Sequence, residues 1–287
     1  MPGPEGQIGT HPNGEVTVET STLRFTVLGC GSSGGVPRIG PEGPHWGDCD
    51  PGDPRNRRRR CALLVERLSP EGRTTVLVDA GPDVRDQLIS AGAGALDAVV
   101  FTHDHADHCH GIDDLRMVVF NRRQRLTAHM DAPTEATLRQ RFGYVFESPP
   151  GSDYPPILDI APITGAFEIA GPGGAVAFHP FAVPHGRGRA LGLRIGPVAY
   201  APDISEMTEE AWSAVDTVEV WILDALRWTK HPSHANVETA LDWIARARPP
   251  RAYLTNLHVD LDYAALDAAT PEHVRPAHDG LVLEFPA

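Results

Sequence analysis

The hydrophobic positions of this chain fall into short runs, separated by polar segments rich in glycine and proline. Residues 23–28 alternate between apolar and polar side chains, which predicts a strand. Residues 98–101 are continuously apolar and predict a buried strand. Similar runs predict strands at 61–66, 75–78, 175–178, 190–195, 198–201, 218–223, 252–254 and 281–285. Helices are predicted at 83–91, 134–145, 206–215 and 236–247.

These elements form two halves, each made of strands followed by helices. This order predicts an α/β fold in which two sheets pack together with helices outside, a four-layer αββα sandwich. Residues 1–20 are rich in glycine, proline and polar residues and predict a flexible tail, which leaves 21–287 as a single domain. The stretch 37–54 has no periodicity and is expected to be a surface loop.

Composition narrows the choice of partners and location. The chain of 287 residues is 41% hydrophobic, and no apolar run approaches the ~20 residues that a membrane helix needs. The N-terminus lacks the basic start and apolar stretch of a secretory signal, so a cytoplasmic location is expected by default. A formal net charge of −13 disfavours long nucleic acid as a partner, because proteins that bind it usually present a basic surface.

None of the four cysteines forms a Cys-x-x-Cys pair, and reduced thiols are expected.

One local exception to the acidic balance is Arg55 with the run Arg57-Arg58-Arg59-Arg60. These arginines are either a solvated entry to the next strand or an anion clamp near a site. The second interpretation is open because guanidinium groups suit phosphate oxygens.

The segment His103-x-His105-x-Asp107-His108 carries the strongest chemical signal. It follows the apolar run 98–101 directly. Alternation along an extended chain would aim His103 and His105 to one side, with Asp107 and His108 in a loop just beyond. Three imidazoles and a carboxylate in six residues suit two adjacent metal ions better than one. The competing interpretation is a histidine-rich surface loop without metal.

Other candidate ligands also follow predicted strands or precede predicted helices. His185 ends an apolar stretch, Asp203 follows a strand, and His258 lies beyond another. Asp203 could instead cap the helix that follows it. His231 and His234 come just before a helix. The nitrogen and oxygen donors suit a pair of Zn²⁺ or Mn²⁺ ions, with Fe²⁺ as a further option, and such a pair can share a hydroxide that attacks an ester.

These residues, taken in order, resemble the metallo-β-lactamase superfamily over most of residues 22–287. Within it the chain is similar to the phosphodiesterase branch that includes phosphoribosyl 1,2-cyclic phosphate phosphodiesterase of the carbon–phosphorus lyase pathway. Ribonuclease Z is a more distant relative. The resemblance is carried by 28–37, 58–61, 78–81, the histidine motif and 254–262.

The resemblance implies a role for each candidate residue. His103, His105 and His185 would hold one ion, and Asp107, His108 and a C-terminal histidine the other, with Asp203 bridging the two. The catalytic residues would be Asp107 and His234, the latter as proton donor to the leaving oxygen. The expected substrate contacts are Ser32, Arg58 and His231.

The chain departs from that branch at two places. The C-terminal ligand histidine of the relative directly follows Leu-Thr, where this chain has Asn256, with His258 two residues later. We expect His258 to be the ligand, because asparagine is a poor one and alternation could bring position 258 to the same side. The relative also carries a structural zinc. Here only Cys49 of its cysteine cluster remains and Val259 replaces its histidine, so this zinc is predicted to be absent.

The expected function is therefore hydrolysis of a small cyclic phosphate or nucleotide-like phosphodiester by a metal-bridging hydroxide. Two alternatives remain: a thioesterase or lactamase-type hydrolase on the same metal centre, and a non-catalytic ligand-binding member. The expected partner is a small molecule, with neither a membrane nor long nucleic acid. The oligomeric state stays open, a homodimer being the commonest assembly for soluble enzymes.

Overall fold

The computed structural model describes residues 20–287, so most of the predicted tail 1–20 lies outside the described residues. Two seven-stranded sheets form its centre, in the orders β16-β1-β4-β5-β6-β7-β8 and β15-β14-β13-β12-β11-β10-β9. The first sheet contains β1 (Thr22–Gly29), β4 (Ala62–Ser69), β5 (Gly72–Val78), β6 (Ala98–Val100), β7 (Leu126–Met130), β8 (Leu158–Pro162) and β16 (Val282–Pro286). The second contains β9 (Phe167–Ile169), β10 (Val176–His185), β11 (Gly188–Ile195), β12 (Val198–Ala201), β13 (Val220–Asp224), β14 (Arg251–Thr255) and β15 (Val274–Pro276).

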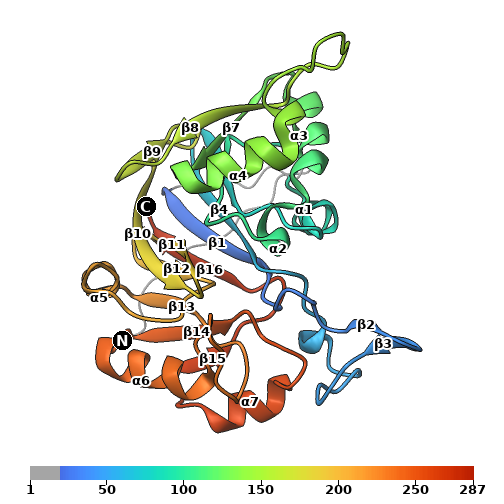
Figure 1. Cartoon of the computed structure of the whole chain (residues 1–287). Coiled ribbons are helices and arrows are strands. Elements are labelled where there is room, and N and C mark those ends of the chain that lie inside the picture. The colour runs from blue at the N-terminus through green and yellow to red at the C-terminus, as the bar shows by residue number, and fades with distance from the viewer. Residues whose placement is uncertain (1–19) are drawn as a thin grey trace, which may run out of the picture.

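The helices lie on the outer faces of the two sheets, as Figure 1 shows. On the first sheet they are α1 (Val84–Ala91), α2 (Ala106–Cys109), α3 (Leu115–Arg122) and α4 (Ala132–Phe142). On the second sheet they are α5 (Glu209–Val215), α6 (Val237–Ala247) and α7 (Tyr263–Ala269). Three 3₁₀ turns complete the described part: η1 (Pro54–Asn56), η2 (Ile112–Asp114) and η3 (Gly143–Val145).

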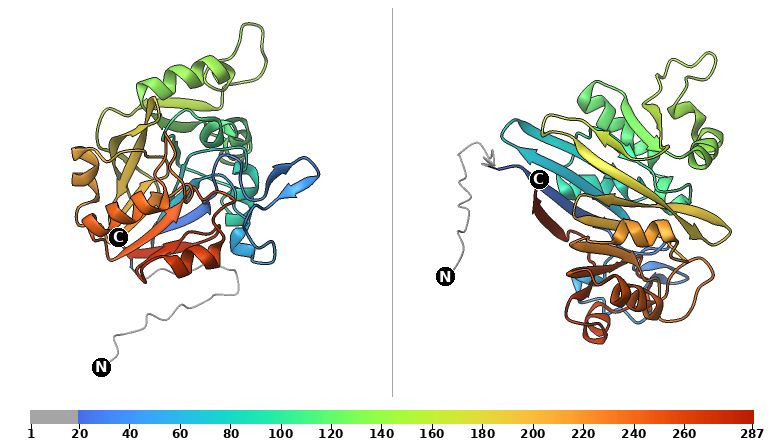
Figure 2. Two further views of the ribbon diagram at one scale, coloured as in Figure 1. Left: turned by 60° about the horizontal axis from the view of Figure 1, so that its bottom comes forward. Right: turned by 90° about the vertical axis from the view of Figure 1, so that its left-hand side faces the viewer.

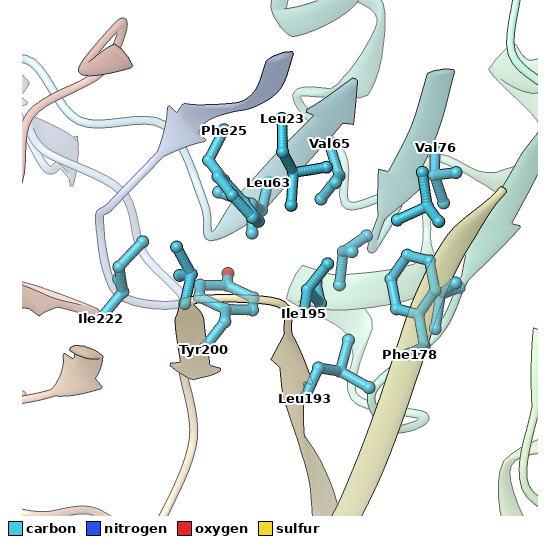
Figure 3. Packing of buried hydrophobic residues seen from close by; sticks show 14 of the residues in the cluster. Leu23, Phe25, Leu63, Val65, Val76, Phe178, Leu193, Ile195, Tyr200 and Ile222 are labelled. Atoms are coloured by element: carbon cyan, nitrogen blue, oxygen red, sulfur yellow. The ribbon is translucent and has the colours of Figure 1, made fainter. Parts of the chain in front are cut away.

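Three separate hydrophobic clusters account for this layering. The central one joins the two sheets, with Phe25 and Val65 of the first facing Phe178 and Ile195 of the second (Figure 3). A second cluster packs α1, α3 and α4 on the first sheet, and a third packs α5, α6 and α7 on the second. Three apolar interfaces define four layers, because each sheet buries side chains on both faces. The predicted αββα sandwich is confirmed.

The elements predicted from hydrophobic periodicity are found with shifted ends, and several short ones were missed. The unpredicted elements are β2 (Arg38–Gly40), β3 (Gly43–His45), α2, α3, β7, β8, β9, α7 and β15. Most are too short for alternation to be distinguished from chance. The segment 37–54, expected to be a loop, contains the β2–β3 hairpin, which stands out from the body of the molecule in Figure 2.

Parallel strand pairing in both sheets determines where a ligand site can form. Strands β5, β6 and β7 pair in parallel, as do β12, β13 and β14. Their carboxyl ends therefore open at one edge of each sheet, which is where ligands bind in parallel α/β sheets. Within residues 20–287, no helix combines the length and hydropathy that a membrane span needs.

Candidate metal centre and active site

The ends of parallel strands deliver polar side chains to one place. Asp79 follows β5, and His103 comes shortly after β6. In the other sheet Asp203 follows β12, Asp224 ends β13, and Asn256 follows β14. Asp79 and Asn256 have positive φ angles of 64° and 61°, a conformation that aspartate and asparagine tolerate better than most residues.

The histidine motif is a turn and a short helix rather than a strand running into a loop. Strand β6 ends at Val100, and Asp107 and His108 lie on α2, with His105 at its N-cap. This turn packs closely on the segment after β5, where a Cβ on Gly81 would lie 1.9 Å from the backbone oxygen of Asp107. Only glycine permits that approach.

Four predicted ligands converge on one point. His103, His105, His185 and Asp203 each offer a ligand atom, and these atoms all lie within 4.8 Å of one another. His185 Nδ1 lies 2.7 Å from the backbone oxygen of Ser233 and donates to it, which leaves Nε2 as the free lone pair. That Nε2 is 3.2 Å from Asp203 Oδ2 and 3.0 Å from His105 Nδ1.

Two further predicted ligands lie beside this cluster. His108 Nε2 is 3.3 Å from Asp203 Oδ1 and 3.6 Å from Asp107 Oδ2. The Nδ1 atom of His108 donates to Asp79 Oδ2 at 2.8 Å, and Asp79 also accepts from the backbone NH of Thr102 at 2.8 Å. A buried carboxylate that fixes one ring nitrogen leaves the other available as a ligand.

The residues present fit divalent metal ions. His103 Nε2 and His108 Nε2 are buried without a hydrogen-bond partner, and each faces an oxygen of Asp203. Burial, together with the His108 ring, holds the pKa of His103 well below its usual range, so its imidazole is neutral as a ligand must be. Burial alone would raise the pKa of Asp203, but the charge and hydrogen bond of protonated His108 outweigh it and hold the carboxyl well below its usual pKa. Burial lowers the pKa of His108, but the carboxylates of Asp203 and Asp79 outweigh it and raise that pKa, so an ion bound to His108 Nε2 would displace a proton.

His234 lies at the open side of this cluster in a second carboxylate–imidazole pair. Its Nδ1 is 2.8 Å from Oδ2 of the fully buried Asp224. Burial lowers the pKa of His234, but the Asp224 charge and hydrogen bond outweigh it and raise the pKa to about 9. A protonated His234 with Nδ1 occupied has only Nε2 left to donate.

A cavity of about 270 Å³ adjoins these groups. His231 and His234 line it, with ring centroids 5.1 Å apart, and the predicted contact Ser32 lies in its wall. Two arginines that the sequence analysis did not single out, Arg38 and Arg227, also line it. The cavity therefore combines acid–base groups with positive charge.

Two predicted site residues lie elsewhere. Arg58 is only 1% exposed, with its guanidinium against Asn56 Oδ1 at 2.9 Å and the backbone oxygen of His258 at 3.4 Å. The expected substrate contact is thus a buried structural group. Arg59 and Arg60 form salt bridges with Asp279 and Asp83, so two arginines of the run are neutralised by neighbouring carboxylates.

His258 does not reach the metal cluster. Its Nδ1 is 3.0 Å from Asp260 Oδ1, and its Nε2 contacts the Arg38 side chain. Asn256 lies in the cluster instead, with Nδ2 3.3 Å from Asp203 Oδ1. The left-handed conformation of Asn256 breaks the alternation on which the expectation for His258 was based.

The segment of the predicted missing zinc is apolar. Cys49 and Val259 pack with Val36 and Trp46, and Cys49 Sγ donates to the backbone oxygen of Val259 at 3.3 Å. The absence of a structural zinc remains a prediction.

Sequence reasoning missed the supporting residues Asp79, Thr102 and Asp224 as well as the two cavity arginines. A signal was available for Asp79 and Asp224, since each comes at the end of a buried apolar run, as Asp203 does. No local signal distinguishes Arg38 or Arg227 from other surface arginines.

Comparison with known proteins identifies the family to which this fold belongs. The model of the β-lactamase superfamily domain matches residues 74–256. A crystal structure of a new diphosphatase from the PhnP family has 31% identity and a TM-score of 0.80, covering 92% of this chain and 97% of that one. The chain therefore belongs to the metallo-β-lactamase superfamily, in its PhnP-like branch.

Two other relatives are more distant or only partly covered. Zn²⁺-bound PqqB from Methylobacterium extorquens has 20% identity and a TM-score of 0.68, covering 91% of this chain and 99% of that one, and shares the fold. An octanoyltransferase from Porphyromonas gingivalis is 32% identical over 266 residues, which is 90% of this chain. The chain spans about half, 51%, of that relative's length. The fold family and the histidine–aspartate cluster together support a metal-dependent hydrolase.

Proposed function

We propose that this chain is a phosphodiesterase with two divalent ions that hydrolyses a small cyclic phosphate or nucleotide-like phosphodiester. The observation that carries the proposal is the cavity beside the metal cluster, where His234 and the two arginines Arg38 and Arg227 lie around one space. A substrate with a negative charge at the reacting centre matches such a lining.

The metal-ligating residues would be His103, His105 and His185 for one ion and Asp107 and His108 for the other, with Asp203 between them. Ions bound there supply Lewis-acid activation of water and of the phosphoryl group. The two oxygens of Asp203 face opposite groups of ligands, Oδ2 toward His185 and Oδ1 toward His108. This arrangement suits a bridging carboxylate.

The protein's own contribution to the bond-breaking step is a proton. When the phosphorus–oxygen bond breaks, the leaving alkoxide needs one, and His234 can donate it from Nε2. Asp224 holds the ring by Nδ1 at 2.8 Å and keeps it protonated. Arg38 and Arg227 would hold the non-bridging oxygens and bring the phosphorus to the cluster.

Hydrolysis of a diphosphate is the second candidate, because the PhnP-family relative of known structure is described as a diphosphatase. Both reactions attack phosphorus and expel an oxygen, so the same residues serve both. A thioesterase activity has less support, since a thiolate leaves without needing the proton that the Asp224–His234 pair is built to hold.

The test is a substrate panel on the Zn²⁺- and Mn²⁺-loaded chain. It comprises bis-p-nitrophenyl phosphate, a cyclic nucleotide, a ribose cyclic phosphate, a nucleoside diphosphate and an acyl thioester. We expect phosphodiester turnover well above that of His103→Ala, which lacks a metal ligand. Thioester turnover with the phosphorus substrates at the level of that variant would overturn the proposal.

A further inference from the structure

The two metal positions of this centre have unequal ligands. Around the first position, three imidazoles (His103, His105 and His185) share the Oδ2 side of Asp203. Around the second position, the candidate ligands among residues 20–287 are one imidazole, that of His108, and the carboxylates of Asp107 and Asp203. Imidazole ligands suit Zn²⁺, whereas carboxylate oxygens suit Mn²⁺ and Mg²⁺.

Asn256 follows Leu-Thr, where the resemblance places the C-terminal histidine ligand of the second position, and it lies beside Asp203. Its Nδ2 lies 3.3 Å from Asp203 Oδ1 and 3.2 Å from Asp224 Oδ1, two acceptors for the two amide hydrogens. His234 Nδ1 is 3.0 Å away, but its own hydrogen goes to Asp224, so it accepts none from Asn256. This amide orientation follows from its surroundings, because the flipped amide would set an oxygen against two carboxylate oxygens. The side chain is 3% exposed, so water does not compete for these contacts.

The amide therefore acts against an ion at the second position in two ways. It presents a hydrogen-bond donor where a ligand needs a lone pair. It also donates to Asp203 Oδ1, the same oxygen that faces His108 Nε2 at 3.3 Å. His258 does not compensate, because its ring is held by Asp260 and Arg38.

We propose that Asn256 makes this a graded centre, with one tightly held transition-metal ion at the His103–His105–His185–Asp203 position and one weakly held, exchangeable ion at the Asp107–His108–Asp203 position. His108 Nε2, which is buried without a hydrogen-bond partner, is the imidazole nitrogen that this second position would offer to an ion. The inference rests on the metal centre of the proposed function but not on its substrate.

The first experiment measures metal binding without any assay of activity. The chain is stripped with a chelator, loaded with excess Zn²⁺, passed through a desalting column and analysed for metal content. We expect a single Zn²⁺ to remain on each chain. Mn²⁺ titrated onto this Zn²⁺-loaded chain should bind at the second position with loss of the free-ion EPR signal. Retention of two Zn²⁺ with matched affinities, or EPR showing no bound Mn²⁺, would overturn the inference.

Substitution at position 256 tests whether Asn256 is the cause of the weaker binding of the second ion. Asn256→His adds an imidazole at a φ that histidine tolerates, and Asn256→Asp adds lone pairs without a change of size. Each should tighten binding of the second ion by about 10-fold or more, because a change in one group around a metal typically alters its affinity by about 10- to 100-fold. Asn256→Asp remains the decisive variant if the histidine fails to fold.

The matched control is His258→Ala, which removes the neighbouring histidine and should leave both affinities unchanged. Tightening absent from both Asn256 variants, or loss of the second ion in His258→Ala, would contradict the assignment. Failure of the proposed function has a different signature, namely graded metal binding without turnover of any phosphorus ester.

Discussion

At the scale of single residues, the site is organised by which ring nitrogen of each histidine is already occupied. Asp79 takes His108 Nδ1, the Ser233 backbone takes His185 Nδ1, and Asp224 takes His234 Nδ1. The first two therefore leave Nε2 facing Asp203, where it could bind a metal ion, and the third leaves Nε2 for the cavity. Identical imidazoles thus have different chemistry because their partners differ.

Asp79→Ala should weaken metal binding, because it frees His108 Nδ1 and leaves the orientation of that ring unfixed. We expect the affinity of the second ion to fall by about 10- to 100-fold. Asp79→Asn keeps an acceptor for the ring NH and should lose less. The measurement is calorimetric titration with Mn²⁺, with the exposed Asp113→Ala as the control, and an unchanged affinity in Asp79→Ala would refute this role.

His234→Ala should slow turnover by about 10²-fold or more when the leaving group is an alkoxide. With a p-nitrophenolate leaving group, which needs no proton near neutral pH, the loss should be much smaller. Steady-state kinetics on an alkyl and an aryl phosphodiester measure this difference, and the exposed His179→Ala serves as the control. Equal losses on both substrates would argue against proton donation.

At the scale of elements, tight contacts hold the histidine motif in place. The segment after β5 contacts the α2 turn at Gly81, and this contact fixes the backbone of Asp107 and His108. The packing of α2 against the segment after β5, and not the sequence of the motif alone, brings these side chains together.

Gly81→Ala should push α2 away from β5, because the new methyl group would lie 1.9 Å from the Asp107 backbone oxygen. Overpacking of this kind costs about 1–3 kcal/mol in the free energy of unfolding. Metal content should fall with it. Gly143→Ala, whose Cβ would meet nothing within 4 Å, is the matched control. Denaturant unfolding and metal analysis test both, and equal behaviour of the two variants would be the contrary result.

Asp262 joins the segment before β4 to α7. Its carboxylate accepts from Ala265 N at 3.0 Å, where it caps the helix, and from Asn56 Nδ2 at 2.7 Å. Asp262→Ala should therefore lower the free energy of unfolding by about 1 kcal/mol.

The Asp262 contribution should depend on pH. Partial burial opposes the shift, but the hydrogen bonds lower the pKa of Asp262. Stability from a carboxyl with a depressed pKa is present above its unfolded value of about 3.9 and is lost as pH falls through the folded pKa. Denaturant unfolding of the wild type and Asp262→Ala should converge at acid pH, and a constant difference would contradict the argument.

At the scale of the whole molecule, the site lies where the two sheets meet. His103, His105, Asp107 and His108 come from the first sheet's side, and His185 and Asp203 from the second. Bound ions would therefore join the two halves of the sandwich.

Removal of metal should lower the melting temperature, because a ligand that binds the native state stabilises it by about 2.7 kcal/mol at 100 times its dissociation constant. Calorimetry of the chelated and Zn²⁺-loaded chain measures this effect, with His103→Ala as the variant that should show little response. Identical melting of the chelated and loaded wild type would refute the metal centre as a link between the halves.

The sequence by itself determined the layers and identified most residues of the candidate metal centre. Buried strands and amphipathic helices produce local hydrophobic periodicity, and the motif His103-x-His105-x-Asp107-His108 brings its ligands close together in the chain. Most of the longer strands and helices were therefore predictable, with α3 as an exception, whereas elements of three residues such as β9 and β15 carry too little periodicity to be recognised.

Only the tertiary structure decided which distant residues complete the site. Asn256 and not His258 stands beside Asp203, because one left-handed residue redirects the chain after β14. Arg58 is buried while Arg38 and Arg227 line the cavity, a choice made by the packing of loops from different sheets. Local pattern contains no information on such contacts, since they join residues far apart in sequence whose positions depend on the whole fold.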